Sequence, residues 1–250
     1  MAVTLLAVLL LLSAAHVWRD RKDYVHFKTL EESAARRAVF ARWILESFLL
    51  YGVSSVVVLA LLGRLPSLQR FPAEFAQVTD SFRAWAEAGG FCGGSVNALI
   101  RLAPLLLVLQ TVGALYRASR GSEEMREALE ARDVFALFPR NARERRWTGL
   151  LSLNAGLSEE LFFRLAAPLL VYEATGSVAL GLVLATVWFG LMHAYQGWVG
   201  VLVTSVVGTI LMAVYLLSGS LWIAVGVHAL LDLNDLWIGP TFEDWLERRR

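Results

Sequence analysis

Residues 177–238 read SVALGLVLATVWFGLMHAYQGWVGVLVTSVVGTILMAVYLLSGSLWIAVGVHALLDLNDLWI. This stretch is a succession of three apolar runs with short turns between them, at about 177–195, 199–217 and 220–238. Each run has about the 20 residues that an α-helix needs to cross the hydrocarbon core of a bilayer. The stretch therefore predicts consecutive membrane helices, joined by turns so tight that one run could be re-entrant.

Four more apolar runs lie upstream, at about 2–18, 39–62, 96–116 and 148–172. With 57% hydrophobic and only 18% charged residues, the 250-residue chain is too apolar for an ordinary soluble domain. The predicted fold class is all-α, a polytopic membrane helical bundle with about seven transmembrane helices. Basic residues follow the first run instead of preceding it, which favours a retained helix over the alternative of a cleaved signal peptide.

The basic residues predict the topology of this integral, multi-pass protein. They gather at 19–37, 140–146 and 248–250, and alternate threading of the helices puts all three groups on one side. The positive-inside rule makes that side cytoplasmic, so the C-terminus is predicted inside and the N-terminus outside. The net charge of +1 provides no basic field for a nucleic acid, so the expected partner is the lipid bilayer.

An amphipathic segment separates the second and third apolar runs. Its apolar residues recur every three or four positions, which places them on one face of a helix: Phe71, Phe75, Val78, Phe82 and Trp85. We interpret this segment as an interfacial helix that lies on the outer leaflet.

Ionisable side chains are scarce between residues 147 and 242. Such a residue costs about 2.5–3.5 kcal/mol at the centre of a membrane helix, so its presence points to a function. Glu160 and Arg164 are four residues apart and are predicted to pair. Glu159 is rotated about 100° from Glu160 on a helix, so it is left unpaired and can face a cleft. Salt bridges that merely join helices are the alternative.

Two histidines belong to later apolar runs. His193 follows Phe189 by four residues, and His228 precedes Asp232 by four, so each pair shares a helix face. A rise of about 1.5 Å per residue places Glu159, His228 and Asp232 near the bilayer midplane. His193 falls in the cytoplasmic half. We therefore expect a cleft that opens toward the cytoplasm.

Three patterns emerge in order along successive apolar runs: EExxxR at 159–164, FxxxH at 189–193 and HxxxD at 228–232. Together they resemble the signature of the CPBP family of CAAX-protease and Abi-type, Rce1-like intramembrane endopeptidases, over roughly residues 147–238. EExxxR also occurs at 31–36, where we interpret it as a chance match on a solvated face.

The resemblance implies an endopeptidase that cuts a membrane-associated or lipidated protein or peptide and needs no cofactor. By analogy with the family, Glu159 and His193 hold and deprotonate the attacking water. His228 and the residue at 232 stabilise the oxyanion. The resemblance also implies supporting residues that brace the site, namely Glu160, Arg164 and Phe189.

Position 232 departs from the family pattern, in which it is most often Asn. An amide donates a hydrogen bond to an oxyanion, whereas an ionised Asp232 cannot. Asp232 must therefore be protonated, orient His228 or bind a metal. Two histidines with Glu159 or Asp232 could also supply three zinc ligands, although the chain contains no H-E-x-x-H motif.

The chain is expected to have three parts. Residues 1–146 would hold N-terminal membrane helices with interfacial and cytoplasmic connections, 147–242 the catalytic helical core, and 243–250 a basic cytoplasmic tail.

Two functions without hydrolysis compete with the endopeptidase. Inward-facing Glu, His and Asp residues also build proton-coupled transporters, although no repeat relates the two halves of this chain. The same residues could instead lock the helices of a non-catalytic membrane adaptor. The sequence selects neither a particular substrate nor an oligomeric state.

Overall fold

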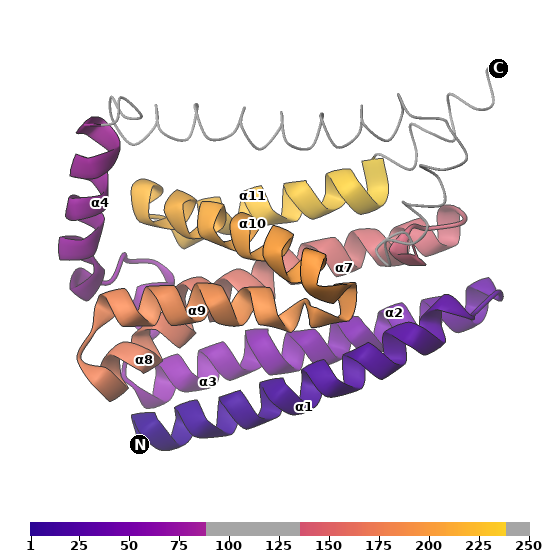
Figure 1. The fold of residues 1–250 in the computed structure, drawn as a ribbon, viewed down its shortest axis with the longest axis horizontal. Coiled ribbons are helices and arrows are strands. Elements are labelled where there is room, and N and C mark those ends of the chain that lie inside the picture. Colours follow the sequence, from indigo (N-terminus) through magenta and orange to yellow (C-terminus); the bar gives the residue numbers. More distant parts are fainter. Residues whose placement is uncertain (89–135, 239–250) are drawn as a thin grey trace.

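A computed structural model describes residues 1–88 and 136–238, and its regular elements there are all helical, as predicted (Figure 1). The α-helices are, in chain order, α1 (Ala2–Lys28), α2 (Ser33–Ser47), α3 (Ser54–Leu61), α4 (Ala76–Ala88), α7 (Ala142–Glu160), α8 (Ala167–Thr175), α9 (Val178–Met192), α10 (Gly197–Ser218) and α11 (Leu221–Leu233). The π-helical segments are η1 (Phe48–Val53), η5 (Leu161–Ala166) and η7 (Asn234–Ile238). The 3-10 turns are η2 (Leu65–Leu68), η3 (Ala73–Phe75) and η6 (Ala194–Gln196).

Three helical stretches are long and apolar enough to cross a membrane: Ala2–Lys28, Ser33–Leu61 and Gly200–Ser218. Val178–Met192 is apolar but shorter. These stretches confirm a helical membrane protein. The predicted span at 96–116, most of the connection predicted to follow it in the cytoplasm and the tail at 243–250 lie outside the described residues. The number of spans therefore stays a prediction.

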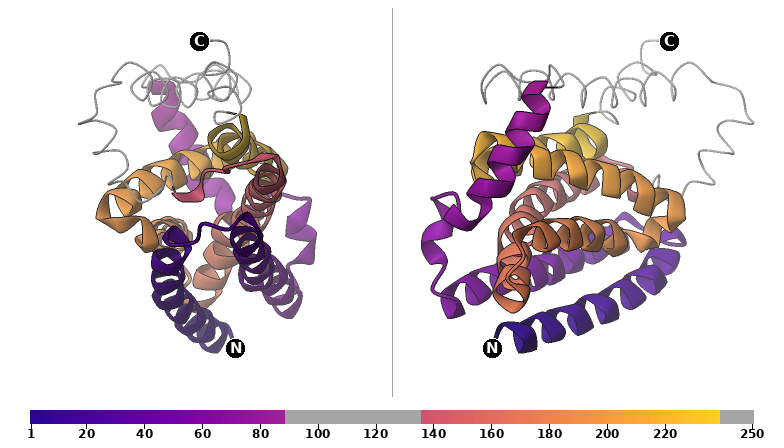
Figure 2. Two further views of the ribbon diagram at one scale, coloured as in Figure 1. Left: turned by 90° about the vertical axis from the view of Figure 1, so that its right-hand side faces the viewer. Right: turned by 60° about the vertical axis from the view of Figure 1, so that its left-hand side comes forward.

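The helices form a bundle in which each packs on its neighbours. The α7 helix contacts α2 on one side and α11 on the other, and α8 contacts α1 and α9. The α10 helix closes the bundle between α9 and α11. The long helices run side by side, while α4 runs across one end of the bundle (Figures 1 and 2). Segments far apart in the sequence therefore meet along the length of α7.

The α4 helix has the crosswise orientation expected of an interfacial helix, but most of its apolar side chains contact protein. It begins later than the periodicity predicts, so Phe71 and Phe75 precede it, and their rings lie 5.3 and 6.4 Å from that of Tyr215 in α10. Phe82 also packs against the core, whereas Trp85 is 66% exposed. Its position on the outer leaflet stays a prediction.

The basic segments around 19–37 and 140–146 meet at one end of the bundle, as alternate threading predicts. Arg36 Nε of α2 donates to Glu144 Oε2 of α7 at 3.1 Å, and both side chains are fully buried. Arg36 ends the EExxxR copy at 31–36, so the interpretation of a solvated face was wrong for this residue. Burial alone would raise the pKa of Glu144, but hydrogen bonds from the Arg140 backbone, Ser33 and Arg36 hold it below its ordinary value.

Glycines allow helices to approach closely at two places that support the later motifs. A Cβ atom on Gly156 of α7 would lie 2.7 Å from the backbone nitrogen of Ala229 in α11. A Cβ atom on Gly208 of α10 would lie 2.7 Å from the Phe189 ring in α9. Membrane helices lack a hydrophobic driving force between them, so such close packing is a main source of their association.

The contact at Gly156 predicts a position-dependent effect of adding one methyl group. Gly156→Ala should lower the stability of the protein in detergent by about 1–3 kcal/mol, the usual cost of overpacking a core. Gly226→Ala is the matched control, because nothing lies within 4 Å of its Cβ position. Thermal unfolding followed by circular dichroism measures both, and equal melting temperatures would contradict the close approach of α7 and α11.

Candidate active site

The EExxxR segment lies where α7 passes into η5. Glu159 and Glu160 end α7, and Arg164 lies within the π-helical turn that follows. The spacing predicted a regular α-helix here, whereas the structure has a π-helical turn. Short π-helical segments occur frequently at functional sites. Arg164 Nε still lies 3.0 Å from Glu160 Oε2, with both side chains fully buried. The predicted pairing of these two residues is therefore confirmed.

Glu160 also binds the second histidine. Its Oε1 atom lies 2.8 Å from His228 Nδ1 of α11, and His228 is only 4% exposed. The Nε2 atom of His228 lies 3.7 Å from Asp232 Oδ2, within ion-pair range but too far for a hydrogen bond. Glu160 therefore orients His228 through Nδ1, and Asp232 lies at the other ring nitrogen.

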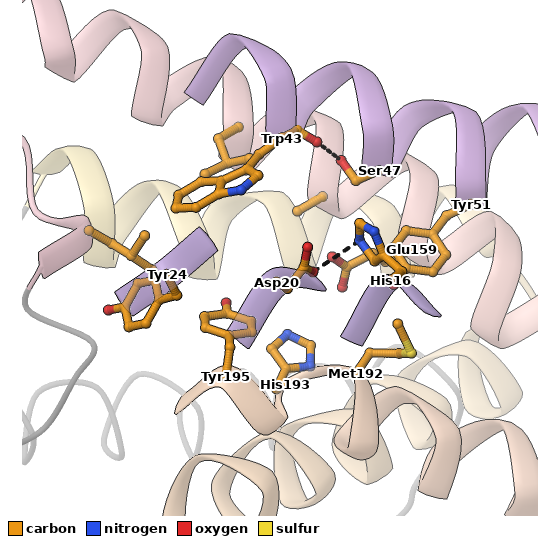
Figure 3. Close-up of a pocket in the computed structure, with 13 residues that line it drawn as sticks. His16, Asp20, Tyr24, Trp43, Ser47, Tyr51, Glu159, Met192, His193 and Tyr195 are labelled. Carbon is orange, nitrogen blue, oxygen red and sulfur yellow. Dashed lines mark hydrogen bonds and ion pairs between the residues drawn. The ribbon is translucent and has the colours of Figure 1, made fainter. Parts of the chain in front are cut away.

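Glu159 faces a different surface of α7 and lines a pocket (Figure 3). Its Oε2 atom is buried without a hydrogen-bond partner in the described part of the chain. A buried carboxylate oxygen without a partner is costly, so such an atom needs water or a substrate group nearby. The two adjacent acids thus face different surroundings: Glu160 contacts Arg164 and His228, whereas Glu159 faces the pocket. Their rotation of about 100° around the helix predicts this difference.

The pocket encloses about 690 Å³ of empty space, counting its open mouth. Three helical stripes with four-residue spacing supply much of its lining: His16, Asp20 and Tyr24; Trp43, Ser47 and Tyr51; Leu151, Ala155 and Glu159. Leu137, Met192, His193 and Tyr195 complete it. Each stripe begins near the level of Glu159 and continues along its helix toward the end of the bundle where the basic segments meet. The pocket therefore extends toward that end.

His193 lies at the C-terminal cap of α9 and shares this pocket with Glu159. Its Nδ1 atom lies 2.9 Å from the carbonyl oxygen of Phe189, one turn earlier. A carbonyl oxygen only accepts, so Nδ1 carries the hydrogen and Nε2 retains its lone pair. His193 is therefore prepared to accept a hydrogen bond from water or substrate.

Phe189 joins the pocket to the Glu160 network. Its ring centroid lies 4.9 Å from that of His193 and 6.0 Å from that of His228. The Arg164 guanidinium lies 4.7 Å from the same ring, on its face. The structure thus places Glu159 and His193 in one pocket, and His228 and its partners in an adjoining cluster behind a shared aromatic wall. Neither His228 nor Asp232 is among the residues that line the pocket.

The α1 helix contributes to this pocket a polar pair that the sequence motifs did not predict. His16 Nε2 lies 3.0 Å from Asp20 Oδ2, and their side chains are 11% and 15% exposed. The signal was available, because His16 and Asp20 have the same four-residue spacing as His228 and Asp232. The pair lies where the first apolar run meets a basic segment, so its spacing does not stand out from the surrounding charges.

The same region holds a group of possible metal ligands. His16, Asp20 and Glu46 each offer an atom within 4.8 Å of the others. Arg19 Nη2 lies 2.7 Å from Glu46 Oε2 and 3.3 Å from His16 Nδ1, so a guanidinium already supplies positive charge. The zinc set expected from the sequence does not gather in this way within residues 1–88 and 136–238 and stays unconfirmed.

Comparison with known proteins agrees with the position of the three motifs. Residues 144–234 match the family model described as type II CAAX prenyl endopeptidase Rce1-like. The match extends from the first turn of α7 into η7, so it includes all three motifs but none of α1 to α4. No curated protein and no solved structure matches the chain. Over residues 144–234 the chain is therefore similar to the Rce1-like type II CAAX prenyl endopeptidases, which identifies the protein as a membrane peptidase.

Proposed function

We propose that this protein is an intramembrane endopeptidase in which Glu159 activates water to hydrolyse a peptide bond of a membrane-associated or lipidated substrate. The observation that carries the proposal is the buried Glu159 Oε2 atom, which has no hydrogen-bond partner among the described residues, in one pocket with a histidine whose Nε2 retains its lone pair. When Glu159 and His193 Nε2 both accept hydrogen bonds from one water molecule, they fix the orientation of that water toward a carbonyl carbon.

In the proposed reaction, Glu159 takes a proton from water as the oxygen bonds to the scissile carbonyl carbon. The carbonyl oxygen becomes an oxyanion, which requires a hydrogen-bond donor. His228 serves as that donor through Nε2, because its Nδ1 is committed to Glu160. The scissile carbonyl must therefore reach past Phe189, whose ring contacts both imidazoles.

The position of Asp232 favours one of the three roles that its chemistry allowed. Carboxylate oxygens face both ring nitrogens of His228, from Glu160 at Nδ1 and from Asp232 at Nε2. Two negative neighbours favour the doubly protonated imidazolium, the form that can donate from Nε2 while it remains bound to Glu160. Asp232 then orients the imidazolium of His228, where an Asn would donate to the oxyanion directly.

The pocket lining suits a lipidated peptide that approaches from the cytoplasmic side. Tyr24, Trp43, Leu151 and Met192 provide apolar walls, and the pocket leads toward the basic end of the bundle. The positive-inside rule assigns that end to the cytoplasm. A farnesylated peptide that ends in a CAAX sequence is therefore the first probe to use.

Replacement of the proposed base tests the function directly. Glu159→Gln nearly preserves volume but cannot take a proton, so processing should fall by at least about 10²-fold. Glu173→Gln is the control, because Glu173 makes a surface ion pair with Arg64 far from the pocket. Peptidomics of membranes that contain each variant, with the farnesylated peptide in parallel, measures the outcome. If neither assay detects a cut that depends on Glu159, the proposed peptidase activity is excluded.

The two adjacent acids should differ in what their loss costs. Glu160→Gln leaves the buried Arg164 without its counter-charge, and its single amide oxygen cannot replace the two carboxylate oxygens that Arg164 and His228 use separately, so it should destabilise the fold by about 3–5 kcal/mol. Glu159→Gln removes a carboxylate without such partners and should keep or raise the melting temperature. Thermal unfolding of both variants decides this, and equal destabilisation would contradict the division of roles.

Metal removal separates the proposed chemistry from the zinc-dependent alternative. Because Glu159 and His193 act on water without a metal here, a chelator such as 1,10-phenanthroline should leave the cutting rate unchanged. Elemental analysis of the purified protein accompanies the assay. Inactivation by the chelator, with recovery when zinc is restored, would replace this mechanism with a metal-dependent one.

A further inference from the structure

A second pocket lies at the turn between α10 and α11, at the end of the bundle that α4 crosses (Figure 1). It encloses about 380 Å³ of empty space, counting its open mouth, and is lined by residues 67–71, Tyr215 and 219–222. None of these lines the candidate active-site pocket. The other end of α11 continues to the basic end of the bundle, where Thr148 Oγ1 donates to the Leu236 carbonyl oxygen at 3.0 Å. The two pockets are therefore separate sites.

The lining of this second pocket favours an anion. Arg70 contributes a guanidinium, and the described residues of the lining include no acid. Ser67, Gln69 and Ser220 add hydroxyl and amide donors. The α11 helix also begins here, and the side chain of its N-cap residue, Ser220, makes no capping bond. The first N–H groups of a helix have no partner within the helix and attract negative charge, above all phosphate.

A buried hydroxyl in the same pocket is an independent indication of a ligand. Tyr215 is only 1% exposed, and its hydroxyl oxygen has no hydrogen-bond partner among the described residues. The rings of Phe71 and Phe75 lie 5.3 and 6.4 Å from the Tyr215 ring and restrict its orientation. A buried polar atom without a partner is costly, so this hydroxyl calls for a polar group from outside the chain.

The rim of the pocket has the character of a membrane interface. Trp222 is 52% exposed, and its Nε1 atom donates to the Leu68 carbonyl oxygen at 3.0 Å. Ile223 and Leu65 beside it are 40% and 43% exposed. Tryptophan at the end of a membrane helix typically lies at the level of the lipid headgroups. Phospholipids are therefore the source of phosphate that this position favours.

We propose that the pocket at the α10–α11 turn binds the phosphodiester of an anionic phospholipid headgroup. Arg70 pairs with the phosphate, the N-terminus of α11 faces it, and the Tyr215 hydroxyl donates to one of its oxygens. An anionic lipid such as phosphatidylglycerol is favoured over phosphatidylcholine, because the lining has no carboxylate to pair with a choline ammonium group. The inference does not depend on the proposed role of Glu159.

Lipid binding to the purified full-length protein, measured by native mass spectrometry, tests the site. Arg70→Gln should weaken the binding of phosphatidylglycerol by about 10-fold and Tyr215→Phe by about 5-fold, because each removes a donor to the phosphate. Arg21→Gln is the matched control for charge, since Arg21 is an exposed residue of α1. Tyr172→Phe is the control for the hydroxyl, since Tyr172 of α8 does not line the pocket. Both controls should bind the lipid as the unchanged protein does.

Thermal unfolding gives a readout that a structural role of Tyr215 would not produce. Without lipid, Tyr215→Phe should keep or raise the melting temperature, because it removes a hydroxyl that has no partner. Phosphatidylglycerol should raise the melting temperature of the unchanged protein more than that of this variant. A lower melting temperature without lipid, together with undiminished lipid binding, would overturn the role of the hydroxyl as a ligand donor.

Inorganic phosphate distinguishes a lipid from a free anion. Binding of phosphatidylglycerol that depends on Arg70 and Tyr215, with no shift in melting temperature on addition of phosphate, would support the lipid site. Binding of inorganic phosphate through the same two residues, without binding of phosphatidylglycerol, would replace the lipid with a free anion. Equal affinity for phosphatidylcholine, or lipid binding that neither Arg70→Gln nor Tyr215→Phe weakens, would overturn the proposal.

Discussion

The Glu160 carboxylate is the interaction on which the rest of this site depends. It meets Arg164 of η5 with one oxygen and His228 of α11 with the other, and all three side chains are almost completely buried. Removal of Glu160 would leave the buried Arg164 guanidinium without its counter-charge, so this acid holds the three side chains in place. Since α7 and α11 are the helices joined, this one acid fixes the position of His228. The adjacent Glu159, turned away by the helical rotation, is left to face the pocket.

Close helix packing gives the site its second support. Gly208 of α10 has no Cβ, so Phe189 of α9 can lie directly against its backbone. From there the Phe189 ring contacts His193, His228 and the Arg164 guanidinium. Gly156 likewise allows α7 to approach Ala229, the residue next to His228. Packing that a membrane protein needs for association thus also determines where its reactive groups lie.

The N-terminal helices complete a pocket that the family-related segment does not close by itself. The stripes from α1 and from α2 with η1 face the stripe on α7, each with one residue per turn directed inward. Lipid-facing positions on the same helices remain apolar and exposed, such as Leu11 at 72%. The polar side chains of His16 and Asp20 are directed instead into the interior, where they line the pocket.

The sequence by itself determined the features that depend on local periodicity. Apolar runs of sufficient length specified the helices, and spacings of four residues specified that Glu160 meets Arg164 and that His193 lies over Phe189. The distribution of arginines specified that residues 19–37 and 140–146 lie at one end. Each of these follows from the geometry of one helix or from the alternation of spans.

Only the tertiary structure decided which helix faces meet. The contact between Glu160 and His228 joins residues 68 positions apart, and the entry of His16 into the Glu159 pocket joins α1 to α7. Both depend on the rotation and tilt of neighbouring helices, which arise from side-chain packing across the whole bundle. A helical period specifies which residues share a face, but it contains no information on what lies opposite that face.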